Sequence, residues 1–219
     1  GSKDDGNLKG ITNYSIELLH QQKINEEKII NSFEKIGALY SSSVNRDSSS
    51  LSIRFINNDS NLDYVSKKLN DILRADNLDI ESLNYTREVI VNSINSRDLS
   101  PGSIVAYRAD EEFFAGTGYS HPISGYKNII ENINITDIQK HLNKIININN
   151  IKISIVGDIN ENEAASFISR SLYNISNKEK VVPIMNKLGY HGDNKVNNIK
   201  HDSSQTHISI YIPSVTRKH

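Results

Sequence analysis

Residues 10–21 read GITNYSIELLHQ, and this stretch decides the fold because it opens the first strongly periodic segment of the chain. Ile11, Tyr14 and Leu18 recur at helical spacing. This spacing predicts an amphipathic helix that turns these three side chains toward a core. The stretch therefore predicts that the chain builds its core around an early helix.

The ends of this helical region are marked by residues that stop or start helices. Thr12 or Asn13 is the expected N-cap, because short polar side chains accept hydrogen bonds from free backbone N–H groups. The helical pattern runs over residues 14–36 as one or two helices, and Gly37 ends it.

The composition excludes several classes of protein. The chain has 219 residues and no cysteine, so disulfides, thiolate zinc sites and a cysteine nucleophile are excluded. Its formal net charge is -1, so the chain does not have the excess of basic residues that is typical of a nucleic-acid binder. No apolar run approaches the roughly 18 residues of a membrane span, and no signal-peptide pattern is visible.

A β-hairpin is expected after the first helices. Leu51, Ile53 and Phe55 alternate with polar residues, which predicts a half-buried strand. Residues 38–44 are its expected partner, joined to it by a turn at residues 45–47.

Helices dominate the remainder of the predicted fold. The expected helix starts are Asp59 or Ser60, Asp79, Ser103, a capping box of Thr136 with Gln139, and a cap of Asn160 with Glu163 for a helix to about Ile175. Residues 151–159 are predicted to be a strand buried on both faces, and residues 206–212 an alternating strand. This order predicts an α+β fold, with helices packed on one face of a mostly antiparallel sheet.

No obvious catalytic constellation emerges from the residues alone. The histidines are His20, His121, His141, His191, His201, His207 and His219, and no two share a helical face at i, i+4. We interpret them as ordinary polar residues, with a weak metal site at His191, Asp193 and His201 as the alternative. The serine runs at residues 41–50 lack a Gly-x-Ser-x-Gly elbow, and adjacent Glu111 and Glu112 point apart on a helix.

Several segments taken together resemble a known family. They are GSKDDGNLKGITNYSIELL (1–19), IGALYSSSVNRDSSSLSIRF (36–55), LSPGSIVAYRADEEFFAGTGYSHPISGY (99–126), ITDIQKHLNKI (135–145), IKISIVGDI (151–159) and SQTHISIYIPSVTR (204–217). In this order they resemble the pitrilysin-type zinc peptidases, which include insulin-degrading enzyme and the mitochondrial processing peptidase. The motif of that family is the inverzincin H-x-x-E-H.

The resemblance implies that the zinc site of the family has been lost. Gly10 fixes the register, so that Asn13 stands for the first histidine ligand, Ile16 for the general base and Glu17 for the second histidine. The same register places Ser93 where the family has its third ligand. One carboxylate does not hold zinc, so these are vacated positions and the chain is expected to bind neither metal nor cofactor.

The resemblance also implies a division of the chain. Residues 1–178 would form a first, inactive peptidase-like domain without the N-terminal strand of the family. Residues 179–203 would be a linker, and residues 204–219 the first strand of a truncated second domain.

The expected function is that of a non-catalytic subunit. It would pair as a heterodimer with a zinc-bearing homologous peptidase and help bind an unfolded, extended peptide. One alternative is a stand-alone peptide-binding or scaffold protein. Another is the inactive half of an active single-chain peptidase. The compartment would be the bacterial periplasm, the cytoplasm or an organelle matrix, with the periplasm preferred.

Overall fold

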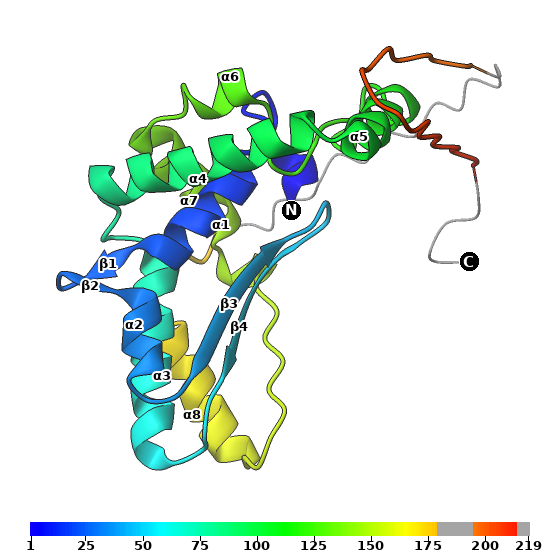
Figure 1. The fold of residues 1–219 in the computed structure, drawn as a ribbon. Coiled ribbons are helices and arrows are strands. Elements are labelled where there is room, and N and C mark those ends of the chain that lie inside the picture. Colours follow the sequence, from blue (N-terminus) through cyan, green and yellow to red (C-terminus); the bar gives the residue numbers. More distant parts are fainter. Residues whose placement is uncertain (179–194, 214–219) are drawn as a thin grey trace.

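The computed structural model describes residues 1–178 and 195–213 and shows an α+β fold (Figure 1). All of its strand pairs are antiparallel. In chain order the elements are the 3-10 helix η1 (Ser2–Asp4), α1 (Ile11–Gln21), β1 (Lys23–Ile24), β2 (Glu27–Lys28), α2 (Ile29–Glu34), β3 (Leu39–Val44), β4 (Ser49–Arg54), α3 (Asp59–Arg74), α4 (Ile80–Asp98), α5 (Pro101–Phe113), α6 (Lys127–Ile130), α7 (Ile135–Ile145), the 3-10 helix η2 (Ile148–Asn150) and α8 (Glu161–Ser171).

Helix α1 lies at the centre of the molecule. It packs against α4, α7 and β3, and α3 pairs with α8 in the lower part of the view (Figure 1). Tyr14 and Leu18 are fully buried and Ile11 is 2% exposed, which confirms the predicted inward face. Burial of each such side chain stabilises the fold by roughly 1.5–3 kcal/mol, so this helix organises the core.

The start of α1 differs from the prediction. Gly10 occupies the N-cap with φ 96°, a conformation that favours glycine, and Thr12 and Asn13 already lie within the helix. The capping group is the buried carboxylate of Asp5, which accepts hydrogen bonds from the backbone N–H of Gly10 at 2.7 Å and of Thr12 at 3.1 Å. The predicted caps at Thr12 or Asn13 are therefore wrong, because a carboxylate from the preceding loop already accepts these bonds.

The hairpin of β3 and β4 confirms the predicted strand pair. Its register pairs Tyr40 with Ile53 and Ser42 with Leu51, and these side chains face the helices. The opposite face alternates with them and is polar over most of its length. It carries Leu39, Ser41, Ser43, Ser50, Ser52 and Arg54. In the described part of the chain, β3 and β4 pair only with each other.

The helix caps show how far local sequence determines a boundary. Asp79 caps α4, and Asn160 forms a capping box with Glu163 at α8, both as predicted. The other three starts lie one to three residues earlier than predicted. They are Asn58 for α3, Ser100 for α5, and a capping box of Asn134 with Asp137 for α7. In each case an earlier polar side chain competes successfully for the same backbone N–H groups.

The strand predicted at residues 151–159 is not formed. This stretch contains no assigned strand, and Val156 is 96% exposed. Only Ile155 and Ile159 pack partly against the core. An apolar run becomes a strand only when a neighbouring backbone pairs with it, and no hydrogen-bond ladder joins this run to another described segment.

The end of the described chain also lacks a predicted strand. Residues 204–213 form no ladder, and Ile208, Ile210 and Ile212 are largely exposed. Within the predicted linker, residues 195–203 are exposed and irregular. Residues 179–194 and 214–219 lie outside the described residues, so the predicted domain boundaries remain predictions.

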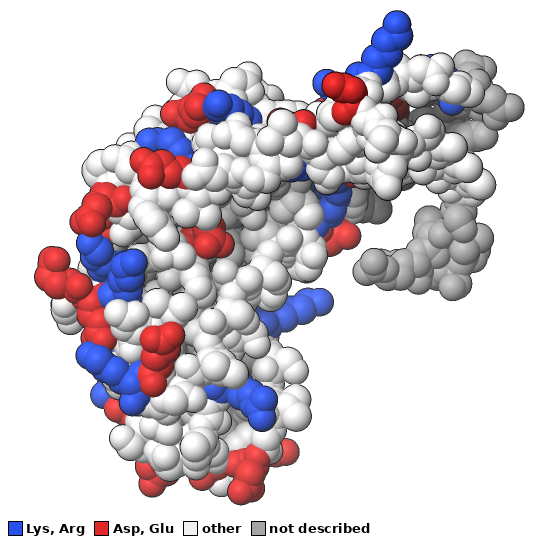
Figure 2. Space-filling view, in the orientation of Figure 1, with Lys and Arg blue, Asp and Glu red and all other residues white. Residues whose placement is uncertain are grey.

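Charged side chains of both signs are interspersed on the face of the molecule shown in Figure 2. Acidic and basic residues alternate along its outer rim, and no single-sign patch gathers there. This distribution agrees with a formal net charge of -1. No helix in the described part of the chain is long and apolar enough to span a membrane.

Candidate functional site

The candidate site is the partly exposed face of α1 beside β3. Asn13, Glu17 and His20 lie on this face at i, i+4 and i+7, and each is partly exposed. Ile16 is only 6% exposed and belongs to the core. In the described residues, the side chains of Asn13 and Glu17 make no hydrogen bond or ion pair. The structure thus brings Asn13 and Glu17 together and turns Ile16 away from them.

The side chains on this face do not fit a zinc ion. Zinc in proteins is held by imidazole, thiolate or carboxylate groups from at least three residues. Glu17 is the one carboxylate here, and Ile16 offers an apolar side chain buried in the core. No group of three His, Cys, Asp or Glu suited to a metal occurs among residues 1–178 and 195–213.

Ser93 lies on the neighbouring helix α4. It is exposed on α4, the helix that packs against α1. Ile90 and Ile94 carry the contact of α4 with the core. In the described structure no hydrogen bond joins Ser93 to Asn13 or Glu17, and its place in the site stays a prediction.

Three aromatic rings pack on one another next to Glu17. The ring of His20 stacks on that of Tyr40 with centroids 4.8 Å apart, and Phe33 lies on Tyr40 at 5.0 Å. Tyr40 is 8% exposed, and its hydroxyl has no hydrogen-bond partner among the described residues. Nδ1 of His20 is also buried and without a partner there. Leaving one such group unpaired costs roughly 1–3 kcal/mol, and neither atom is exposed to a ligand from solvent.

Burial and the neighbouring Glu17 both affect the pKa of the Tyr40 hydroxyl. Burial raises the pKa of the Tyr40 hydroxyl above its ordinary value, and the nearby carboxylate of Glu17 raises it further. Tyr40 is therefore neutral at physiological pH. Glu17 supplies the negative charge of the site, and Tyr40 supplies a neutral hydroxyl.

Strand β3 adds a backbone edge to the site. Its ladder with β4 uses one side of the strand, and no other described strand pairs with it. Beyond the end of β3, the N–H groups of Ser2 and Lys3 donate to the carbonyl oxygens of Asn45 and Arg46. An extended peptide can pair with such an edge by main-chain hydrogen bonds.

Buried polar contacts hold α1 in place behind the site. Nε2 of His141 on α7 lies 2.9 Å from the hydroxyl of Thr12, next to Asn13. Burial, with a smaller effect of Lys144, lowers the pKa of His141 to about 4. His141 is therefore neutral at pH 7 and serves as a structural contact between two helices.

A second buried cluster fixes the loop before α1. Nε2 of His121 lies 3.1 Å from the carbonyl oxygen of Ser2 and 3.9 Å from Oδ2 of Asp5. Burial lowers the pKa of His121 and raises that of Asp5. Arg46 at the hairpin turn donates to the carbonyl oxygen of His121 and pairs with Asp110 at 2.6 Å. These contacts tie the hairpin turn to the helix start, which is a structural role.

The histidines at the chain end do not form a described site. His191, Asp193 and His219 lie outside the described residues. His201 and His207 are exposed, and His207 packs against Gly102 of α5.

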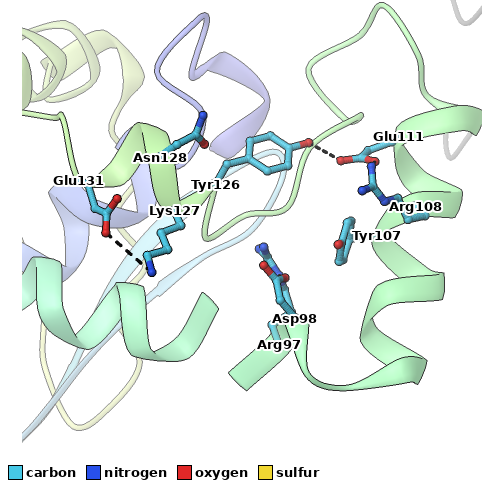
Figure 3. Close-up of a pocket in the computed structure, with 9 residues that line it drawn as sticks. All are labelled: Arg97, Asp98, Tyr107, Arg108, Glu111, Tyr126, Lys127, Asn128 and Glu131. Atoms are coloured by element: carbon cyan, nitrogen blue, oxygen red, sulfur yellow. Dashed lines mark hydrogen bonds and ion pairs between the residues drawn. The ribbon is translucent and has the colours of Figure 1, made fainter. Parts of the chain in front are cut away.

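A separate polar cleft of about 360 Å³ lies between the end of α4, α5 and α6 (Figure 3). Its charges compensate one another through Arg97 with Asp98 at 2.8 Å, Arg108 with Glu111 at 2.7 Å and Lys127 with Glu131 at 4.0 Å. Tyr126 also donates to Glu111 at 2.6 Å. Because its groups already have partners, this cleft is a weaker candidate than the face of α1.

The sequence reasoning missed the part of the site that tertiary contacts create. The sequence predicted Glu17 and His20 within one early helical region but did not connect them with Tyr40. Strand alternation could have placed Tyr40 on the helix-facing side, since it lies opposite Ile53 in the expected hairpin. The register between α1 and β3 has no local signal in the sequence.

Two family models match the chain. The model described as "Insulinase (Peptidase family M16)" matches residues 1–126, which is more than half of the chain. The model described as "Peptidase M16 inactive domain" matches residues 132–219. No curated protein matches.

Solved structures show the same fold at low identity. A peptidase M16 inactive domain from Pseudomonas fluorescens is 18% identical with a TM-score of 0.75, and the match covers 78% of this chain and 42% of that one. A protease from Helicobacter pylori is 18% identical with a TM-score of 0.67, covering 84% and 45%. The periplasmic protease PqqL from Escherichia coli is 15% identical with a TM-score of 0.70, covering 84% and 22%.

This chain thus spans less than half the length of each of these three structures. At such identities the likeness shows the fold alone. The family assignment rests on the insulinase model, which covers the helix α1, the hairpin and the candidate site. The chain belongs to the insulinase family of M16 peptidases.

Proposed function

We propose that this chain is a non-catalytic M16 domain that binds an extended peptide beside α1 and β3 and works with a zinc-bearing homologue. The observation that carries the proposal is the face of α1. At the positions that the resemblance assigns to the metal site it has Asn13, a buried Ile16 and Glu17, beside a strand, β3, that pairs only with β4 among the described residues.

The chemistry of this face argues against catalysis by the chain itself. Peptide hydrolysis by this family needs a metal to lower the pKa of a bound water and a carboxylate to take its proton. Asn13 and Ile16 offer neither a strong ligand nor a base. Ile16 is moreover packed in the core, so no small rotation would bring a different group into its place.

The strand edge supports peptide binding without strong sequence preference. Main-chain hydrogen bonds to residues 39–44 would hold any extended segment that lacks proline. The exposed serines of the hairpin add no bulky side chain that would block its approach. Loss of the metal with retention of this edge is what a substrate-binding subunit requires.

The function can be tested by separating binding from cleavage. The full-length protein is incubated with zinc and an unfolded peptide, alone and with a homologue that has an intact H-x-x-E-H motif. We expect peptide binding by the protein alone, and cleavage that is faster with both proteins than with the homologue alone. Zinc-dependent cleavage by this protein alone would overturn the proposal.

The same experiment discriminates the two alternatives. A stand-alone binding protein would bind peptide and leave the rate of the homologue unchanged. The inactive half of a longer peptidase is favoured by one observation, since this chain covers only 22% of the E. coli protease. In that case the complete reading frame would carry the intact motif and would cleave without a second protein.

A further inference from the structure

We propose that the polar cleft between α4, α5 and α6 binds a free α-amino acid as its zwitterion, with Lys127 holding the carboxylate and Glu131 the ammonium. The cleft has a volume of about 360 Å³, which lies at the lower end of the range for small-molecule sites. It is separate from the face of α1, so this inference does not rest on the proposed function.

The wall of the cleft formed by α5 and the end of α4 consists of side chains that are already hydrogen-bonded (Figure 3). Arg97 donates to the carbonyl oxygen of Gly125 at 2.9 Å. The carboxylate of Glu111 accepts from Tyr126 at 2.6 Å and from Arg108 at 2.7 Å. These bonds hold the wall in place, so a ligand meets a preformed surface on that side.

The opposite side, at α6, carries a much looser pair. Nζ of Lys127 lies 4.0 Å from Oε1 of Glu131, which is too long for a hydrogen bond. The two side chains are 50% and 48% exposed. An exposed ion pair at i, i+4 contributes little to stability, so a ligand can open it at little cost. The donors of the ammonium and the acceptors of the carboxylate are therefore available to a ligand in the cleft.

The balance of charge in the cleft favours a ligand with both signs. Its lining contains three basic and three acidic side chains, namely Arg97, Arg108, Lys127, Asp98, Glu111 and Glu131. A simple anion on Lys127 would be repelled by Glu131, and a simple cation on Glu131 would be repelled by Lys127. A zwitterion offers a partner to each, so one loose ion pair is exchanged for two charge-assisted hydrogen bonds.

The spacing of the pair favours a free amino acid over a peptide. The ammonium and the carboxylate of an α-amino acid are attached to one carbon atom, and the charges of Lys127 and Glu131 are similarly close at 4.0 Å. Each further residue of an extended peptide moves the terminal charges apart by up to about 3.3–3.6 Å. An extended tripeptide would therefore satisfy only one member of the pair at a time.

An NMR titration of the isotope-labelled protein with L-alanine tests the site. We expect saturable shifts of the backbone amides of residues 126–131, with a dissociation constant of about 1 mM, as is reasonable for so small a ligand. The absence of saturable shifts at these residues would overturn the proposal. The proposed function would be unaffected, since it concerns a different surface.

Three analogues separate the two charges and their spacing. N-acetylalanine lacks the ammonium, alaninamide lacks the carboxylate, and trialanine moves the charges apart. We expect each to bind about tenfold more weakly than alanine, as the loss of one charge-assisted hydrogen bond predicts. Binding of any of the three as tight as that of alanine would overturn the assignment to an amino-acid zwitterion.

Single variants test the two partners. Lys127→Gln and Glu131→Gln should each weaken alanine binding about tenfold. Lys67→Gln is the matched control, because it breaks another exposed i, i+4 ion pair, with Asp63 at 2.6 Å on α3. The control should bind alanine as the wild type does. An equal loss in all three variants would show an effect of net charge alone and would overturn the site.

A charge exchange gives the sharpest measurement. Lys127→Glu alone should abolish binding of alanine, because two carboxylates then repel the ligand. The double variant Lys127→Glu, Glu131→Lys keeps both charges in exchanged places, and a zwitterion can turn round to meet them. We expect the double variant to recover most of the affinity. A double variant that is folded by circular dichroism and does not bind would overturn the proposal.

Discussion

At the level of single residues, Ile16 and Glu17 show how neighbouring positions of one helix can have opposite roles. Ile16 is buried in the core, whereas Glu17 is partly exposed beside Tyr40. A charge at position 16 would have to be desolvated among apolar side chains, which is costly. The apolar residue therefore stabilises the fold at the position that the resemblance assigns to the general base.

His141 makes stability depend on pH. Its pKa is lowered by burial to about 4 in the folded chain, against about 6.5 when unfolded. The unfolded chain thus binds a proton more readily, and acidification from pH 6.5 to 4 should lower the free energy of unfolding. The expected loss from this group is about 3 kcal/mol, from roughly 1.4 kcal/mol per pKa unit.

The measurement is urea unfolding at a series of pH values, together with NMR titration of the histidine ring. His141→Gln should remove this part of the pH dependence while the contribution of His121 remains. An NMR pKa for His141 near the ordinary value of about 6.5 would contradict the prediction.

At this scale the sequence predicted the buried side chains better than their polar partners. The spacing of Ile11, Tyr14 and Leu18 was sufficient, because helical periodicity determines which side of a helix faces the core. The Asp5 cap could not be predicted in the same way. Its carboxylate reaches Gly10 and Thr12 from a loop, and no local rule connects these positions.

At the level of elements, α1 begins at a close backbone contact. A Cβ on Gly10 would lie 2.8 Å from Cα of Gly125, and the φ of Gly10 is 96°. Side chain and backbone conformation thus both oppose any other residue there. This contact fixes the position of the start of α1 relative to the loop before α6. Helix α1 carries the candidate site.

The variant pair Gly10→Ala and Gly37→Ala separates these two effects. Gly37 also has a positive φ, of 67°, but a Cβ there would meet nothing within 4 Å. We expect Gly37→Ala to destabilise the fold by about 1 kcal/mol through backbone strain alone. Gly10→Ala should cost at least about 2–3 kcal/mol, since strain and overlap add.

Chemical denaturation of both variants provides the measurement. Circular dichroism in the absence of denaturant would show whether each variant is folded. Equal destabilisation of the two variants would mean that the backbone near Gly125 moves aside and that the close contact does not constrain α1.

The elements also show where a sequence pattern is insufficient. The hairpin was predictable because its two strands are close in sequence and their alternation agrees. The run at residues 151–159 has the composition of a buried strand. Its state depends on a partner that local sequence cannot supply.

At the scale of the whole molecule, the sheet is small, and residues 151–159 form no strand that would extend it. Among the described residues, residues 152–158 donate no backbone hydrogen bonds. Hydrogen exchange should therefore be fast there and about a hundredfold or more slower at those amides of β3 and β4 that donate to the ladder, because the ladder must open before they exchange.

Hydrogen–deuterium exchange read by mass spectrometry tests this difference within one sample. Helix α1 is the internal reference, because its buried face should give the strongest protection. Protection of residues 152–158 equal to that of β4 would show that this segment has a strand partner, and the predicted strand would then be right.

The side of β3 that pairs with no described strand bears on how readily the protein self-associates. Natural proteins protect such edges with lysine, proline or a bulge, and the segment LYSSSV contains neither lysine nor proline. The same free backbone groups that would receive a peptide can also pair with another copy of this strand. Under the proposed function, peptide binding and self-association would compete for one surface, and a bound peptide would keep the protein monomeric at high concentration.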